Sequence, residues 1–529
     1  MTDRIYLFDT TLRDGAQTQG VDFSVADKVA IAQALDRLGI DYIEGGWPGA
    51  NPTDDAFFAD PPSLSNSKLI AFGMTRRPGR SAENDPGLAP LLQADVAGLC
   101  LVGKSWDFHV DVALEIEKEE NIRMISDSIR LAAEKKGEAM YDAEHFFDGW
   151  KANKDFALAC VTAAYEAGAR WIVLCDTNGG TLPHEVDAIV REVTQHIPGD
   201  HLGIHAHNDT ENAVANSLAA VRAGVRQVQG TINGLGERCG NANMCSLIPS
   251  LILKMGLETG LKPNALAEIT GLSRLLDGRL DRSPNRHAAY VGPAAFSHKG
   301  GLHVSAIAKD PRTYEHIPPE TVGNKRHIVV SDQAGRSNIL ARLEEIEVEI
   351  GEEALRRLLE KVKEREFQGY AYDGAEASFE LLARAAKGEV PNYFDISRFR
   401  VMDERRHNAV GNLITESEAT VQVELKGTQI MRVAMGNGPV NALDTALREA
   451  VIQIYPDLAG MQLVDYKVRI LPPPKGSTGT DAVTRVTIES EDEEGARWST
   501  VGVSANIIDA SVIALYDAYA YKLVRDGIT

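Results

Sequence analysis

Two histidines that could bind one metal ion stand one residue apart in the run Leu202-Gly-Ile-His205-Ala-His207-Asn208-Asp209. In an extended chain, residues i and i+2 project from the same face. His205 and His207 would therefore point together, as two ligands of a single cation do. Two histidines in one such run favour this interpretation over a pair of core histidines that are satisfied by hydrogen bonds.

A possible third ligand lies near the N-terminus, where the first apolar run leads into Asp9-Thr-Thr-Leu-Arg13-Asp14-Gly-Ala-Gln17. The neighbours Arg13 and Asp14 could hold an anionic substrate and a metal, although a surface ion pair explains these residue types equally well. With Asp14 added, the set is one carboxylate and two imidazoles with open positions. Such a set suits Mg, Mn, Zn or Co, and spacing cannot choose among them.

A glycine-rich run, Asn233-Gly-Leu-Gly-Glu-Arg-Cys-Gly240-Asn241-Ala-Asn243, follows the last candidate strand of this region. Its glycine density indicates a backbone that approaches a ligand closely. Asn241 could add an oxygen to the same metal. A tight turn between a strand and a helix is the alternative for any single residue here.

These residues must be positioned by the elements of residues 4 to about 260, where short apolar runs alternate with helix-period stretches. Eight strand–helix units in this length predict a (β/α)8 TIM barrel, in which the carboxyl ends of the strands form the catalytic face. A doubly wound open sheet is the alternative, but no GxGxxG follows the first strand. The expected strands are Ile5–Phe8, Tyr42–Glu44, Leu69–Phe72, Gly98–Val102, Glu138–Asp142, Trp171–Cys175, Leu202–His205 and Val225–Gly230. The expected helices include Val25–Leu38, Val110–Lys135, Lys154–Ala167, Pro183–His196 and Glu211–Ala223.

The remainder of the chain changes character twice. Residues 261–395 are mainly helical, and residues 396–529 contain two similar repeats, each with three strand-like runs followed by a helix. We therefore expect an α/β protein of three parts: a barrel (1–260), helical linker subdomains (261–395) and a C-terminal α/β repeat domain (396–529).

Bulk properties narrow the function. The net charge of −21 argues against a nucleic-acid partner, because such proteins present a basic face. The sequence contains no run of 18 apolar residues, so no membrane span is predicted, and its charged first residues do not resemble a signal peptide. Five cysteines without CxxC spacing are typical of reduced thiols. A cytoplasmic enzyme fits these features.

The motifs DTTLRDGAQ, HAHND and NGLGERCGNA together resemble the metal-dependent Claisen-condensing acyltransferases of the DRE-TIM metallolyase superfamily, which includes 2-isopropylmalate, homocitrate and citramalate synthases. The resemblance covers almost the whole chain. It implies that Asp14, His205 and His207 bind a divalent metal with Asn241 nearby, and that acetyl-CoA is a substrate.

The resemblance also assigns residues one by one. Arg13 would polarise the keto oxygen, with Gln17 in the same loop, and Thr177 would touch the substrate carboxylate. Glu144 matches an active-site Glu, although Tyr141-Asp-Ala-Glu-His145 differs from the Ser-Pro-Glu-Asp of some relatives. His303 and Tyr314 match residues that a small subdomain brings over the site, from the neighbouring subunit in dimeric relatives. Without the family, these two would be ordinary surface residues.

The run Glu44-Gly-Gly-Trp47-Pro-Gly-Ala-Asn-Pro52 resembles the branch that condenses pyruvate, where isopropylmalate synthases tend to have Glu-Ala-Gly-Phe-Pro. The expected product is then (R)-citramalate, at the start of a threonine-independent route to isoleucine. Trp47 could fill the side-chain pocket or simply pack under the barrel mouth. An isopropylmalate synthase acting on 2-oxoisovalerate is the alternative function. A lyase or aldolase of the superfamily is disfavoured because Ser297–Ser305 contains no cysteine.

The C-terminal repeats resemble the regulatory domain of these synthases, which binds an end-product amino acid at a dimer interface. The resemblance implies a homodimer, with isoleucine as the effector of residues 396–529.

Overall fold

The computed structural model describes residues 4–262, 264–328, 336–407, 409–471 and 482–528. The chain divides into two compact units. Unit 1 comprises residues 1–296 and 317–326, and unit 2 comprises residues 297–316 and 327–529. Domain boundaries at 260 and 395 remain predictions. No helix within the described ranges is both long enough and apolar enough to cross a bilayer.

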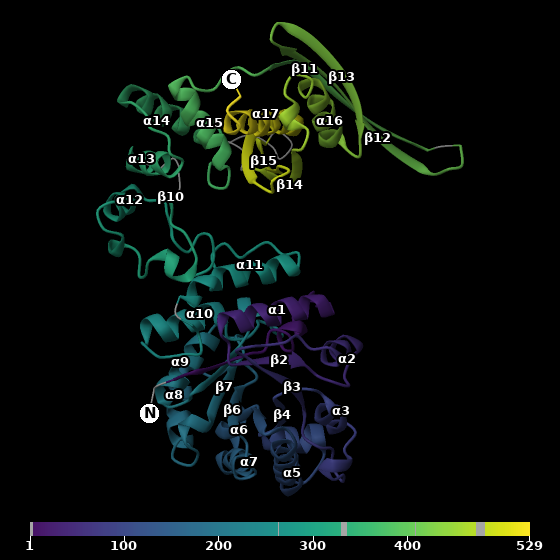
Figure 1. The fold of residues 1–529 in the computed structure, drawn as a ribbon, viewed down its shortest axis with the longest axis vertical. Helices are drawn as coiled ribbons and strands as arrows, with labels where there is room; N and C mark the ends of the chain where they lie inside the picture. Colours follow the sequence, from purple (N-terminus) through teal and green to yellow (C-terminus); the bar gives the residue numbers. More distant parts are fainter. Residues whose placement is uncertain (1–3, 263, 329–335, 408, 472–481, 529) are drawn as a thin grey trace. The chain divides into compact units, whose positions relative to one another are not determined.

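Unit 1 is the expected closed barrel, with eight parallel strands in sequence order (Figure 1). The strands are β1 (Tyr6–Asp9), β2 (Tyr42–Gly46), β3 (Lys68–Met74), β4 (Gly98–Lys104), β5 (Glu138–Glu144), β6 (Trp171–Asp176), β7 (Leu202–Ala206) and β8 (Gln227–Gly230). All eight expected strands are present, with shifted ends. The open sheet is thereby excluded.

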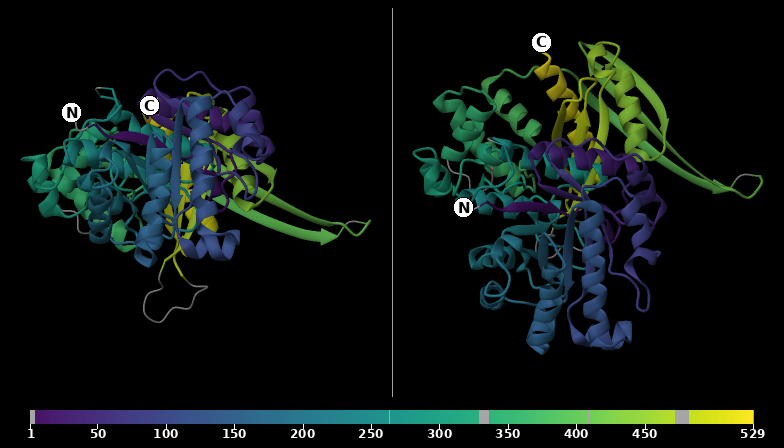
Figure 2. Two further views of the ribbon diagram at one scale, coloured as in Figure 1. Left: turned by 90° about the horizontal axis from the view of Figure 1, so that it is seen from below. Right: turned by 60° about the horizontal axis from the view of Figure 1, so that its bottom comes forward.

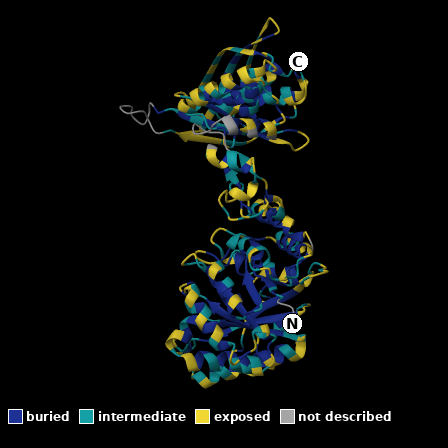
Figure 3. Cartoon of the chain, turned by 90° about the vertical axis from the view of Figure 1, so that its left-hand side faces the viewer, coloured by how far each residue is buried: buried dark blue, intermediate teal, exposed yellow. Residues whose placement is uncertain are grey.

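Helices cover the outside of the barrel, and the strands are buried while the outer helix faces are exposed (Figure 3). The helices of unit 1 are α1 (Val25–Leu38), α2 (Pro52–Ala59), α3 (Leu88–Gln93), α4 (Asp107–His109), α5 (Lys118–Lys136), α6 (Phe146–Ala152), α7 (Lys154–Glu166), α8 (Pro183–Val193), α9 (Ala213–Ala223), α10 (Met244–Pro249) and α11 (Ile269–Arg279). Local sequence explains the bounds of α1: Ser24 and Asp27 form a capping box, and Gly39 ends the helix at φ 98°.

The single helix expected over Val110–Lys135 is wrong. A five-residue π-helix, Val110–Leu114, is followed by Glu115 in the left-handed region (φ 53°), and α5 begins only at Lys118. Around the break, the apolar residues Val110, Val112, Leu114 and Ile116 recur at every second position, and Val112 is 61% exposed, so one continuous helical face was not a sound reading of this stretch.

Two separate cores hold the barrel together. One lies between strands and helices. The other fills the barrel itself with large side chains and includes Phe8, Phe72, Met140 and Trp171. The barrel is thus a packed core with its chemistry confined to one end, as barrel enzymes require.

The first helices of unit 2 are α12 (Gly301–Ile307), α13 (Arg336–Glu345), α14 (Glu352–Phe367) and α15 (Glu376–Lys387). Two three-stranded antiparallel sheets follow, each completed by a helix, as the repeat predicts. The first contains β11 (Asp395–His407), β12 (Leu413–Leu425), β13 (Thr428–Gly436) and α16 (Pro439–Val451). The second contains β14 (Gln462–Ile470), β15 (Thr484–Glu491), β16 (Arg497–Ser504) and α17 (Ile507–Arg525). Strands β11 and β12 extend as a long hairpin beyond α16 (Figure 2).

Candidate active site

Three side chains converge at the carboxyl end of the barrel. Asp14 follows β1, His205 lies in β7 and His207 comes just after it, and all three are buried. The Oδ2 atom of Asp14 is 3.2 Å from Nε2 of His205 and 3.9 Å from Nε2 of His207. The two Nε2 atoms are 3.2 Å apart. Ligands about 2.1 Å from one cation are separated by about 3.0–3.4 Å. Both distances to Nε2 of His205 lie in this range and the third is longer, so a small shift of His207 or Asp14 would let all three atoms hold one metal ion.

Local structure explains this convergence. The chain makes a tight turn after β1, in which the amide of Asp14 donates to the carbonyl of Thr10 at 2.8 Å. The amide of His207 donates to the carbonyl of Asp176 on the neighbouring strand at 3.2 Å. These bonds aim a carboxylate and two imidazoles at one point from strands distant in sequence.

Asn241 joins the same cluster through the glycine-rich run. Its Nδ2 donates to Oδ2 of Asp14 at 2.7 Å and lies 3.4 Å from Nε2 of His205. Its Oδ1 is buried without a hydrogen-bond partner within the described residues. A Cβ on Gly236 would lie 2.0 Å from that oxygen. The glycine therefore admits the loop's own Asn241 amide, rather than the ligand contact expected from the sequence.

The charges of the cluster favour cation binding. Burial raises the pKa of Asp14, but Arg13 and both histidines outweigh it and hold the carboxyl ionised. Burial, assisted by the charge of His205, lowers the pKa of His207 to about 3, which leaves a neutral imidazole. Burial also lowers the pKa of His205, but its hydrogen bond to Asp14 produces a net rise. An ionised carboxylate beside a neutral imidazole is a suitable ligand set.

Arg13 lies beside this cluster, fixed on two sides. Its Nε donates to Oε2 of Glu44 at 2.7 Å, and its guanidinium stacks 3.9 Å above the ring of Phe72. Glu44 is fully buried on β2, and burial, opposed by Arg13, raises its pKa to about 7. Sequence reasoning gave Glu44 no role. A fully buried carboxylate on a barrel strand, which requires a partner, was the available signal.

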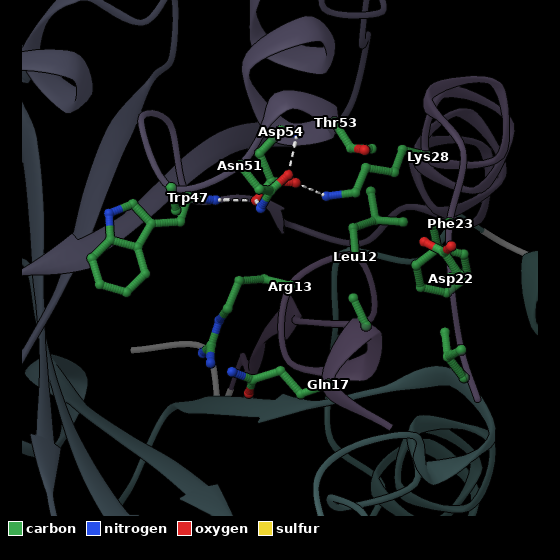
Figure 4. Close-up of a pocket in the computed structure, with 13 residues that line it drawn as sticks. Leu12, Arg13, Gln17, Asp22, Phe23, Lys28, Trp47, Asn51, Thr53 and Asp54 are labelled. Atoms are coloured by element: carbon green, nitrogen blue, oxygen red, sulfur yellow. Dashed lines mark hydrogen bonds and ion pairs between the residues drawn. The ribbon is translucent and has the colours of Figure 1, made fainter. Parts of the chain in front are cut away.

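A cavity of about 400 Å³ opens next to Arg13. Gln17 lines it from the loop after β1, and Trp47 lines it from the end of β2 (Figure 4). The buried Lys28–Asp54 ion pair forms another part of the wall. Arg13 and Gln17 thus share a space large enough for a small acid.

Two other predicted site residues, Glu144 and Thr177, lie at the ends of the neighbouring strands β5 and β6, and each contacts another residue. Glu144, at the end of β5, forms an ion pair with Lys104. Thr177 follows β6, and its Oγ1 accepts a hydrogen bond from the amide of His145 at 2.8 Å. These contacts do not join either residue to the Asp14 cluster, and their roles remain predictions.

His303 and Tyr314 belong to unit 2, whereas the cluster above belongs wholly to unit 1. Their rings stack with centroids 4.1 Å apart. Tyr314 is 44% exposed, and His303 is also exposed. The two predicted residues therefore form one pair on the surface of unit 2.

A second group of possible ligands, Glu44, Cys100 and Asp142, lies inside the barrel. Burial raises the pKa of the Cys100 thiol well above its usual value, so the thiol keeps its proton. Metal ions bind the thiolate form. This group is a poor metal site, and Glu44 is already paired with Arg13.

Comparison with known proteins agrees with the fold. A family model described as HMGL-like matches residues 4–272. Models described as a homocitrate synthase post-HMGL domain-like region and as the LeuA allosteric (dimerisation) domain match residues 290–369 and 373–523.

Curated relatives match the chain along its full length. It is 52% identical to an (R)-citramalate synthase of Geobacter sulfurreducens, over 98% of this chain and 97% of the relative. It is 49% identical to an (R)-citramalate synthase of Aquifex aeolicus, over 99% of both chains. A probable 2-isopropylmalate synthase of Methanopyrus kandleri is more distant, at 35% identity over 97% of both chains. At this level of identity over its whole length, the chain belongs to the family of (R)-citramalate synthases.

Proposed function

We propose that this chain condenses acetyl-CoA with pyruvate and water to form (R)-citramalate and CoA. The observation that carries the proposal is the convergence of Asp14, His205 and His207 beside Arg13, in a chain 49–52% identical to full-length curated (R)-citramalate synthases. The isopropylmalate alternative is represented by a more distant relative, at 35% identity.

Asp14, His205 and His207 would hold a divalent cation, with Asn241 beside them. When bound, the cation supplies Lewis acidity to the keto oxygen and neutralises charge that develops there. Mg, Mn, Zn and Co remain open, because this donor set suits all of them.

The chain's own residues perform the remaining steps. Arg13 presents a permanently charged planar fork toward the keto oxygen as that oxygen becomes an alkoxide. Gln17 and Thr177 orient the substrate carboxylate. A base removes a proton from the acetyl methyl, and the resulting carbon attacks the keto carbon to form the new C–C bond. Water then cleaves the thioester, so the acyl group becomes a carboxylate and CoA leaves as the thiol.

We propose His303, with Tyr314 stacked on it, as the base assembly, and Glu144 as a residue that orients it or the substrate. The family resemblance and the stacked pair support this choice. The H303N variant should lose exchange of the acetyl methyl hydrogens with solvent while binding the metal normally. Exchange at the rate of the unaltered chain would exclude His303 as the base.

The activity is tested by following thiol release from acetyl-CoA with pyruvate, 2-oxobutyrate or 2-oxoisovalerate, with and without a chelator. We expect metal-dependent release that is fastest with pyruvate, and (R)-citramalate as product. Preference for 2-oxoisovalerate would indicate an isopropylmalate synthase. Formation of pyruvate from citramalate or its thioester would indicate a lyase.

The match of residues 373–523 to a dimerisation domain supports a homodimer with a regulatory site. We propose isoleucine as the effector, since citramalate leads to 2-oxobutyrate, a precursor of isoleucine. Adding isoleucine and leucine separately to the same assay should show inhibition by isoleucine, and inhibition by leucine alone would contradict the proposal. The molar mass in solution should be twice 57.4 kDa.

We propose that Trp47 limits the size of the substrate. Its ring packs edge-on against Phe72 at 5.5 Å, and the Arg13 guanidinium lies over the ring of Phe72. Trp47 also lines both the cavity next to Arg13 and a second cavity that is lined by Met74. Trp47 thus both packs on the barrel core and borders the proposed substrate space.

The W47A variant should raise kcat/KM for 2-oxobutyrate relative to pyruvate by about 10- to 100-fold, because hydrophobic size selection is worth about 1–3 kcal/mol per methylene. The M74A variant is the control, since Met74 lines the second cavity and not the one next to Arg13. The ratio of the two kcat/KM values measures the effect. An unchanged ratio in W47A, or an equal change in M74A, would contradict the role of Trp47.

A further inference from the structure

The two histidines of the cluster differ in what their second ring nitrogen contacts. Nδ1 of His205 is 2.8 Å from Oε1 of Gln229, which is fully buried on β8. Nδ1 of His207 is also buried but has no hydrogen-bond partner within the described ranges. Within the described residues, His205 is therefore the histidine whose second ring nitrogen is held by a neighbouring side chain.

Gln229 is itself oriented by a third residue. Its Nε2 donates to Oδ1 of Asp142, a buried carboxylate on β5, at 3.2 Å. A glutamine amide could present either end to an imidazole, but a carboxylate oxygen accepts hydrogen bonds, so the NH₂ end faces Asp142. The carbonyl end is then left for His205.

This arrangement determines which nitrogen of His205 carries the proton. A neutral imidazole has one N–H, and the carbonyl of Gln229 accepts it at Nδ1. When a cation takes the place of the Nε2 proton that Asp14 accepts, the lone pair of Nε2 is free to bind it between Asp14 and His207. The opposite amide orientation would place the proton on Nε2 and block the site.

We propose that Gln229 is a positioning residue for the metal site: oriented by Asp142, it fixes the ring and the tautomer of His205. The inference rests on the proposed metal site and adds two residues, from β8 and β5, that do not touch the cation. Partners of this kind typically change metal affinity by about 10- to 100-fold.

The barrel supplies a matched control on the same strand. Gln227 lies two residues before Gln229, is equally buried, and contacts the Sδ atom of Met140 at 3.8 Å rather than a histidine. Methionine has nearly the volume of glutamine and cannot accept a strong hydrogen bond. We therefore compare Q229M with Q227M, after checking that both unfold at temperatures near that of the unaltered chain.

The experiment measures binding of Mn²⁺, Mg²⁺, Co²⁺ and Zn²⁺ to the metal-free full-length chain by calorimetry, without substrates. We expect the Kd of Q229M to rise about 10- to 100-fold and that of Q227M to stay within about threefold. The Q229E/D142N variant exchanges the amide and the carboxylate between the two positions. The carboxylate on β8 can then accept from Nδ1 of His205, while the amide on β5 donates to that carboxylate. This variant should recover most of the affinity.

Three results would overturn the inference: unchanged affinity in Q229M, equal weakening in Q227M, or a folded Q229E/D142N variant without recovered affinity. An unaltered chain that binds none of the four cations would overturn the proposed metal site together with this inference. Because no substrate is present, failure of the pyruvate assignment alone would leave these affinities unchanged.

Discussion

Replacing Asp14 with alanine is expected to abolish cation binding and to lower the rate of citramalate formation by about 10³-fold or more. The reason is that Lewis-acid polarisation contributes several kcal/mol to the barrier, and each 1.36 kcal/mol is a factor of ten. Asp14 is the only carboxylate among the three converging side chains. Without it, two neutral imidazoles would remain, a weak site for a hard divalent ion.

The matched control for D14A is D9N. Asp9 is a fully buried carboxyl in the same motif, but its oxygens accept from the amide and hydroxyl of Thr11 at 2.9 and 3.0 Å. An asparagine can keep that turn, so the metal affinity of D9N should remain within a few-fold. Calorimetry and thiol release measure both variants. A D14A variant that binds cations and turns over normally would remove the basis of the proposed function.

The barrel and the pairing of His205 with His207 were predictable because their signals are local. Alternation of strands and helices gives the barrel, and the i, i+2 spacing of His205 and His207 places both on one side of a strand end. The repeat of three strands and a helix was visible in the same way. In each case, neighbouring residues carry the information.

Side-chain partners that lie far apart in sequence were not predictable. Gln229 on β8 and Asp142 on β5 meet across the barrel interior, whereas Arg13, which follows β1, meets Glu44 on the neighbouring strand β2; no spacing in sequence links either pair. The break at Val110–Leu114 was missed for another reason: the helical pattern of Lys118–Lys136 was extended back over a stretch in which a π-helix interrupts the regular helix. The sequence alone does not reveal these tertiary contacts, and the same contacts determine how the proposed metal ligands are held.

The R13Q variant should lower kcat by about 10²- to 10³-fold, the usual loss for one donor to a developing oxyanion. Arg13 also neutralises buried Glu44, so lower activity could reflect structural damage instead. The catalytic and structural roles of Arg13 are separable, because removing Arg13 leaves the carboxyl of Glu44 without its ion-pair partner and the charge of that carboxyl depends on pH. The R13Q/E44Q double variant removes that carboxyl as well.

The pH dependence of stability separates these two roles of Arg13. Burial raises the pKa of Glu44 to about 7 even beside Arg13, and without Arg13 it should rise further. A carboxyl whose pKa is raised by folding makes the folded protein less stable as the pH increases from the carboxyl's unfolded-state pKa toward the raised value. In the unaltered chain this loss is complete near pH 7. The deficit in unfolding temperature of R13Q should therefore grow as the pH rises above about 7. In R13Q/E44Q this growth should vanish while kcat stays low. Recovery of kcat in the double variant would instead assign Arg13 a purely structural role.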